Sequence, residues 1–301
     1  MTLSEQVTKN IIKKLLDGKD YRIEIITLIN AKFLQFAIDF FKRVAEAKLN
    51  SKNIDTDWYK LEMLSTNLSP DEIAINSGLN KKTITNMYNS GTREVVIEAS
   101  YEHYETLYKA IDELTKVEDL NLSLQIKFNK VSVELDINES LITINALAVK
   151  RAALRGGLWS TAGKQTEGPL MITLCKLYSV PKKNYSIKTK AKKIKKGEVN
   201  REIDFFLIND SVEYKCEVKL MGKGNPESAD AVIARDSSVF IADKLSEQNK
   251  AQLESLDIEW VEFRNINGFK KFKSVLETLK IPHNDLINEY KIDDILEEIF
   301  K

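Results

Sequence analysis

The chain has few of the residues that most metal clusters and covalent frameworks require. Its 301 residues include two cysteines, Cys175 and Cys216, and two histidines, His103 and His283. Both cysteines fall in stretches that read as core, so neither a disulfide framework nor a zinc cluster is expected. Two isolated histidines argue against a histidine-rich metal site and against a Ser/His/Asp hydrolase.

Three other features are missing. No apolar run approaches the ~20 residues that cross a bilayer, and residues 1–10 lack the apolar block of a secretory signal, so we expect a cytoplasmic protein with no membrane partner. No Gly-x-x-x-x-Gly-Lys-[Ser/Thr] loop is present to cradle a nucleotide. The 45 basic and 45 acidic side chains cancel, so the molecule as a whole is not a polycation.

The most informative stretch, residues 201–219, reads as two consecutive strands. Asp204 lies in the first, and strict alternation in the second, 212–219, gives Glu217 and Lys219 a common face. A carboxylate on one strand and a Glu-x-Lys pair on its hairpin partner can hold a divalent cation, with an ammonium beside the attacking water. This pattern is suited to hydrolysing a phosphodiester.

Acid-x-Lys alone is a weak signal, because it recurs at Asp17-x-Lys19 and even within the same strand at Glu213-x-Lys215. An ordinary hairpin with a solvated charged face would carry the same alternation. Only the pair at Glu217 ends a strand, follows a strand with an aspartate and precedes a glycine-containing turn. The neighbouring elements therefore decide between the two interpretations.

Those neighbours predict a mixed α/β core. Residues 160–178 open with a capping candidate and continue with leucines at helical spacing, and 185–190 fits a strand before Asp204. Further along, 237–242 reads as a strand, 246–256 as a helix and 257–263 as another strand.

Asp204, Glu217 and Lys219 within such an αβββαβ order resemble the PD-(D/E)xK nuclease superfamily, although Ile203 stands where its proline would be. More narrowly, residues 159–165, 168–171 and above all 216–231 resemble CfrBI-type type II restriction endonucleases. The resemblance is close over the C-terminal half. It implies Mg²⁺-dependent cleavage of double-stranded DNA at a short, palindromic sequence, in a prokaryote that also carries a cognate DNA methyltransferase.

The resemblance also implies roles for particular residues. Asp204 and Glu217 would coordinate the cation with the Val218 carbonyl as a third ligand, and Lys219 would polarise or deprotonate water. Glu167 resembles an additional acid near the metal, and the alternative is a capping or solvent-facing carboxylate. Contacts to base edges are implied in the polar turn that follows, at Lys223, Asn225, Ser228, Asp230 and Arg235.

A basic stretch precedes the strand that carries Asp204. Residues 182–196 contain eight lysines and no acid. Beside a metal centre such a stretch is expected to contact DNA phosphates, with Lys192 and Lys193 at its centre. The alternative is a loop that lysines keep solvated.

The first 120 residues are expected to be mostly helical, because apolar residues recur at helical spacing over 3–16, 23–49 and 101–114. Within them, residues 69–88 have the spacing of a helix-turn-helix, with Gly78 at the turn and Ile84 packing the second helix onto the first. That second helix would present Lys81, Lys82 and Thr83 to DNA. A plain helical hairpin is the alternative.

A β-hairpin is expected at 122–137, then a helix at 138–155 and a linker at Gly156-Gly157. We therefore expect a mostly helical DNA-binding region over 1–150 and a catalytic domain over 151–301. One centre per chain and a two-fold symmetric site together predict a homodimer. Rival functions are a repair or junction nuclease on the same core, and a non-catalytic helix-turn-helix regulator.

Overall fold

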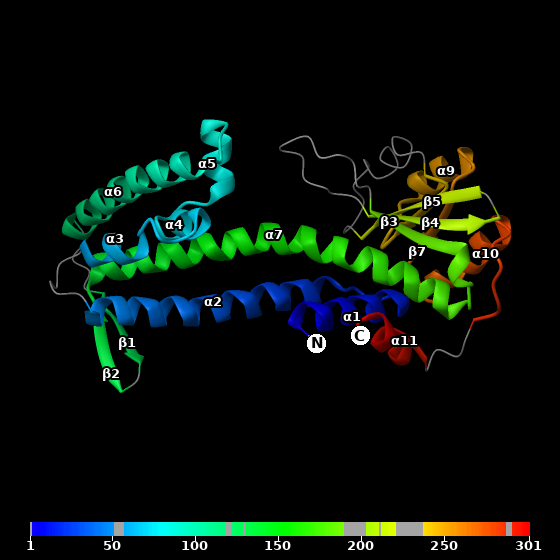
Figure 1. Ribbon diagram of the computed structural model, residues 1–301, viewed down its shortest axis with the longest axis horizontal. Helices are drawn as coiled ribbons and strands as arrows, with labels where there is room; N and C mark the ends of the chain where they lie inside the picture. Colours follow the sequence, from blue (N-terminus) through cyan, green and yellow to red (C-terminus); the bar gives the residue numbers. More distant parts are fainter. Residues whose placement is uncertain are drawn as a thin grey trace. The chain divides into compact units, whose positions relative to one another are not determined.

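The computed structural model is a mixed α/β structure with a mostly helical N-terminal region (Figure 1). It describes residues 2–50, 57–117, 122–128, 130–189, 203–210, 212–220, 237–286 and 291–301, without the side chains of residues 57, 128, 131, 160, 188, 189, 203 and 204. Two compact units divide the chain. Unit 1 comprises residues 1–28 and 158–301, and unit 2 comprises residues 29–157.

Unit 2 is built almost entirely from helices. Phe40, Trp58, Tyr59 and Tyr104 contribute large buried rings to its core, and the Tyr59 and Tyr104 rings stack with centroids 5.7 Å apart. The helical texture expected for this region is confirmed. Its elements are most of α2 (Arg22–Asn50), α3 (Asp57–Met63), α4 (Pro70–Asn76), α5 (Lys81–Tyr88), α6 (Arg93–Val117), the hairpin β1 (Leu124–Phe128) and β2 (Val131–Leu135), and the first half of α7 (Ile137–Leu177).

The helix, turn and helix expected at residues 69–88 are α4, a four-residue connection and α5. Ser69 caps α4 in a capping box with Glu72, and Gly78 turns the chain with φ +90°, a conformation that favours glycine. Ile84 on α5 is fully buried with Ala74 of α4 and with two residues of α6, so the three helices share one small core.

Unit 1 contains a five-stranded mixed sheet in the order β3-β4-β5-β6-β7. β3 to β5 pair antiparallel, and β5, β6 and β7 pair parallel. Its strands are β3 (Tyr185–Thr189), β4 (Ile203–Asn209), β5 (Val212–Lys219), β6 (Val239–Ala242) and β7 (Glu259–Glu262). Its helices are α1 (Leu3–Leu16), the second half of α7, α9 (Glu247–Ser255), α10 (Lys271–Thr278), α11 (Ile292–Ile299) and two short 3₁₀ turns, Lys182–Asn184 and Gly268–Lys270.

Helices cover both faces of this sheet. α7 brings Cys175 close to Cys216 of β5, and its last turn leads into Tyr178, whose ring lies 6.0 Å from that of Phe272 in α10. On the opposite face, α9 packs Leu253 against Phe240 of β6. Both cysteines are buried and free, as the sequence predicted.

The helices expected on either side of Gly156-Gly157 are one helix, α7, so the expected break between them is wrong, although the boundary between the two units falls directly after Gly157. Each glycine costs about 1 kcal/mol in a helix, and Pro169 removes one backbone hydrogen bond. Long helical stretches on both sides outweigh these penalties. No helix in the described part of the chain is long and apolar enough to span a membrane.

Candidate active site

The site begins with β5, whose bounds are those predicted from the sequence. In the β5–β6 ladder, Cys216 and Val218 pair with Val239 and Ile241, whereas Glu217 pairs with Phe240 and Lys219 with Ala242. Paired residues of neighbouring strands point to the same face. Glu217 and Lys219 therefore lie on the face that α9 covers, and Cys216 and Val218 lie on the α7 face.

Glu217 is a buried carboxylate, with 6% of its surface exposed. The Lys219 ammonium lies 3.1 Å from its Oε1, and a quarter of the Lys219 side chain remains exposed. The expected shared face is confirmed by this contact. The alternative of a solvated charged face fails at Glu217, because this side chain is buried beside Phe240 of β6.

Asp204 is brought to the same place by the β4–β5 register. Phe205 pairs with Cys216, so continuing the antiparallel ladder by one pair sets the Asp204 backbone opposite Glu217. Alternation along β4 gives Asp204 the same face as Glu217. The β3–β4 register also pairs the backbone of Lys188, from the basic stretch 182–196, with that of Asp204.

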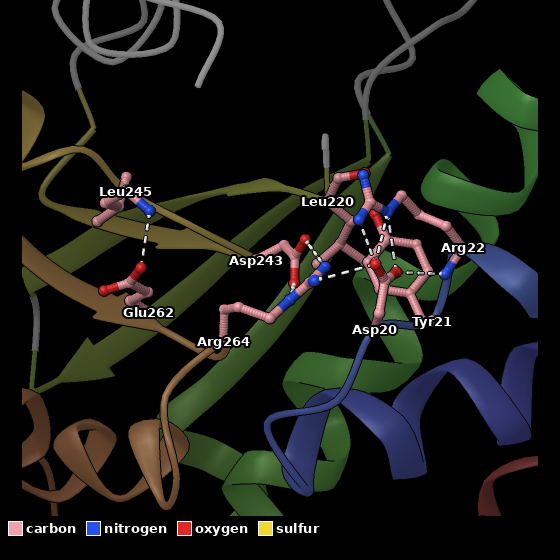
Figure 2. Close-up of polar contacts among 8 residues, drawn as sticks. All are labelled: Asp20, Tyr21, Arg22, Leu220, Asp243, Leu245, Glu262 and Arg264. Atoms are coloured by element: carbon pink, nitrogen blue, oxygen red, sulfur yellow. Dashed lines mark hydrogen bonds and ion pairs between the residues drawn. The ribbon is translucent and has the colours of Figure 1, made fainter. Parts of the chain in front are cut away.

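Charged residues gather at the carboxyl ends of β6 and β7, next to the end of β5 (Figure 2). The Arg264 guanidinium binds both carboxylate oxygens of Asp243, at 3.0 and 2.6 Å, and its third nitrogen lies 3.1 Å from Asp20. Burial raises the pKa of Asp243 above its usual range, although Arg264 opposes the shift. Hydrogen bonds from Arg22 hold the pKa of Asp20 well below its usual range.

Tyr21 also lies at the carboxyl ends of these strands, beside the end of β5. Its hydroxyl donates a 2.7 Å hydrogen bond to the carbonyl of Leu220, the residue after Lys219 (Figure 2). The side chain is 2% exposed, and burial raises the pKa of its hydroxyl. Sequence reasoning missed this residue, because 199 positions separate the two partners and no local spacing signals the contact.

Glu167 lies on α7, half-buried, and its neighbour Gly168 approaches Ile187 of β3. Ile187 pairs with Phe205, so this part of α7 covers the face opposite Glu217. A metal role for Glu167 stays a prediction.

In unit 2, Lys81 and Lys82 are exposed in the first turn of α5, and Thr83 is half-buried. The Thr83 amide donates to the Asn80 side chain, which caps the helix. α5 contains no acidic residue, so its exposed face carries only positive charge. The remaining expected DNA contacts lie outside the described residues: Lys192, Lys193, Lys223, Asn225, Ser228, Asp230 and Arg235.

The residues at the end of β5 fit a hard divalent cation. The Glu217 carboxylate is an oxygen ligand of the kind that Mg²⁺ prefers, and the Asp204 backbone lies on the neighbouring strand β4. Across the described side chains, which exclude that of Asp204, no group of three His, Cys, Asp or Glu residues is arranged to hold a metal. A site here therefore depends on Asp204 joining Glu217.

An acid–lysine strand end on a mixed α/β sheet suits an enzyme that hydrolyses phosphodiesters, and comparison with known families identifies the class as restriction endonucleases. The model of the CfrBI restriction endonuclease family matches residues 5–250. The chain belongs to this family, and its activity is type II, site-specific cleavage of DNA. No curated protein and no solved structure matches the chain.

Proposed function

We propose that the protein cuts both strands of DNA at a short palindromic sequence, with Mg²⁺ held by Asp204 and Glu217. The observation that carries this proposal is the β4–β5 register, which pairs Phe205 with Cys216. Continued by one pair, it would set the Asp204 backbone opposite Glu217, two residues before Lys219. Such an arrangement of two acids and an ammonium is the donor set of a PD-(D/E)xK nuclease core. The buried position of Glu217 supports it, because a low-dielectric surrounding strengthens binding to a cation.

The side chains have separate roles in this proposal. When bound, Mg²⁺ would supply Lewis-acid stabilisation of the charge that develops on the phosphate. Glu217, Asp204 and the Val218 carbonyl would fix its position, and Glu167 is a further candidate ligand. Lys219 holds its ammonium 3.1 Å from Glu217, where it would donate a hydrogen bond that orients and polarises the attacking water.

One experiment separates the proposal from its rivals. The protein is incubated with Mg²⁺ and a long linear double-stranded DNA, and the products are resolved by size. Discrete fragments with a common end sequence support site-specific cleavage. A smear, or a preference for branched substrates, would indicate a repair nuclease, and the absence of any product would indicate a regulator that only binds.

We also propose that α4 and α5 form a helix-turn-helix that contacts DNA. Ile84 fixes α5 against α4 and α6, which leaves Lys82 and Asn86 on the side of α5 directly away from the core. Lys81 and Lys82 add charge complementary to phosphates. A recognition helix in this position would enter the major groove by its first turns.

Replacing Lys81 and Lys82 with alanine is expected to weaken binding to specific and random DNA alike. Each lost phosphate contact should reduce the slope of log affinity against log salt concentration by about one unit. The measurement is a salt titration of binding in the absence of Mg²⁺. Lys109→Ala, an exposed lysine of α6, is the matched control, and equal slopes in all three proteins would exclude α5 as a phosphate-binding helix.

The working unit is proposed to be a homodimer. One chain carries a single Asp204, Glu217 and Lys219 set, whereas a palindromic site offers two strands related by a two-fold axis. Sedimentation measured with a cognate duplex, and compared with the protein alone, is expected to give two chains per duplex. One chain per duplex that cuts both strands in turn would contradict the proposal.

The setting follows from the activity. An enzyme that cuts DNA at a short sequence would also cut the genome of its host, so we propose a partner methyltransferase that modifies the same sequence in a prokaryotic cytoplasm. Two sets of residues outside the described ranges are also proposed to contact DNA. The DNA backbone would be contacted by Lys192 and Lys193, and the bases by Lys223, Asn225, Ser228, Asp230 and Arg235.

A further inference from the structure

The segment from Asp17 to Arg22 leads from α1 into α2, and its Asp20 and Tyr21 lie beside Arg264 and Leu220 at the carboxyl ends of the strands (Figure 2). Gly18 allows this approach. It has φ +68°, and a Cβ at its position would lie 2.7 Å from the Asn265 carbonyl oxygen, just after β7. The segment therefore meets the loop after β7 by direct backbone contact.

The ion pairs described above hold the segment in register with the strands. Arg264, which follows β7, joins buried Asp243 after β6 to Asp20 in the segment. Arg22 binds the same carboxylate of Asp20. Bidentate guanidinium pairing fixes orientation as well as distance, so Tyr21, between Asp20 and Arg22, is held at the strand ends.

The β5–β6 ladder weakens where Tyr21 acts. Its last pair is Lys219 with Ala242, and beyond it the Asp243 amide lies 3.4 Å from the Lys219 carbonyl oxygen, near the limit of a hydrogen bond. One residue further, the Tyr21 hydroxyl donates to the Leu220 carbonyl at 2.7 Å inside the protein. The shorter and better-protected bond at this end of β5 thus comes from a side chain of the N-terminal segment.

We propose that Tyr21 is a positioning residue for cleavage: through the Leu220 carbonyl it fixes the end of β5, and with it the ammonium of Lys219. The proposal rests on the function proposed for Lys219 above. Tyr21 itself touches neither DNA nor metal in this role. Its effect is geometric, because a reacting group displaced by about 1 Å can lose as much as a hundredfold in rate.

Tyr21→Phe removes only the hydroxyl and keeps the buried ring. We expect kcat to fall about tenfold, with KM and DNA affinity unchanged, when cleavage is measured well below the unfolding temperature. The matched control is Tyr101→Phe, whose hydroxyl donates to the Leu64 carbonyl at the same 2.7 Å distance in unit 2. It removes a similar hydrogen bond and should leave kcat unchanged.

A double variant tests whether Tyr21 acts through Lys219. If it does, adding Tyr21→Phe to Lys219→Ala should slow the residual cleavage no further, because the group being positioned is already absent. Independent, multiplicative losses would overturn the proposal. Arg264→Lys keeps the positive charge but loses the bidentate geometry, so it should also lower kcat and leave KM unchanged. A wild-type kcat in this variant would show that the Arg264 ion pairs do not help to position Tyr21.

Two variants separate the positioning role of Tyr21 from the proposed catalytic role of Lys219. Wild-type cleavage by Lys219→Ala would overturn the proposed catalytic centre. A loss of cleavage in Lys219→Ala together with a wild-type kcat in Tyr21→Phe would leave that centre intact and overturn only the positioning role.

Discussion

Replacing Glu217 with alanine is expected to abolish DNA cleavage and to leave site-specific binding largely intact. A lost metal ligand removes several kcal/mol of stabilisation of the developing charge, and each 1.36 kcal/mol is tenfold in rate, so cleavage should fall by about a thousandfold or more. Most of the affinity comes from phosphate and base contacts elsewhere. In the proposed site this carboxylate repels the scissile phosphate when Mg²⁺ is absent, so its removal is not expected to weaken binding.

The strand itself supplies the control. Glu213-x-Lys215 repeats the acid-x-lysine pattern on the same face of β5, but Glu213 pairs with Ile208 rather than lying opposite Asp204. Glu213→Ala should therefore cleave at close to the wild-type rate, and Asp204→Ala should behave like Glu217→Ala. The measurement is single-turnover cleavage with Mg²⁺, paired with binding in its absence. Undiminished cleavage by Glu217→Ala would reject the assigned centre.

Replacing Glu139 with alanine is expected to destabilise unit 2 by about 3–5 kcal/mol, because it leaves a largely buried lysine without its counter-charge. Glu139 is 4% exposed and forms an ion pair with Lys48, whose side chain is 14% exposed. The same carboxylate accepts a 2.6 Å hydrogen bond from the Trp58 indole and caps α7 through the Asp136 amide at 2.9 Å. One substitution therefore breaks a helix cap and two core contacts.

Urea unfolding followed by circular dichroism measures this loss. Glu105→Ala is the matched control, because Glu105 pairs with Lys60 at the surface, with 48% and 42% of the side chains exposed. Such pairs contribute about 1 kcal/mol or less. Equal destabilisation by the two substitutions would show that the buried contacts of Glu139 contribute no more than a surface ion pair. Glu139→Gln should be intermediate, since it keeps hydrogen-bonding capacity but not charge.

Local pattern was enough to predict several elements. Period-two alternation gave the bounds of β5, and the Ser69 and Gly78 signals gave the turn between α4 and α5. The face shared by Glu217 and Lys219 followed from the same alternation and is confirmed by their contact. These features depend on residues within one or two turns of each other, where sequence carries most of the information.

The remaining features depend on distant residues. Gly156-Gly157 looks like a break, and only the flanking helical stretches of α7 make it a continuous helix. Alternation in β5 is also compatible with a solvated charged face, but Glu217 is buried within the folded sheet, where strands can be covered on both faces. No local rule relates Tyr21 to Leu220, because their contact exists only once the sheet has formed.

The division of the chain into units sets an order of assembly during synthesis. Unit 2 is one uninterrupted stretch, 29–157, whereas unit 1 joins residues 1–28 to residues 158–301. A nascent chain folds from its N-terminus as it leaves the ribosome, so the helices of unit 2 can form early. At that stage Leu220 and Arg264, the partners of Tyr21 and Asp20, have not yet been synthesised. This order is expected to protect cellular DNA from nicking by unfinished chains, since the proposed cutting centre can form only after the C-terminal half of the chain has been made.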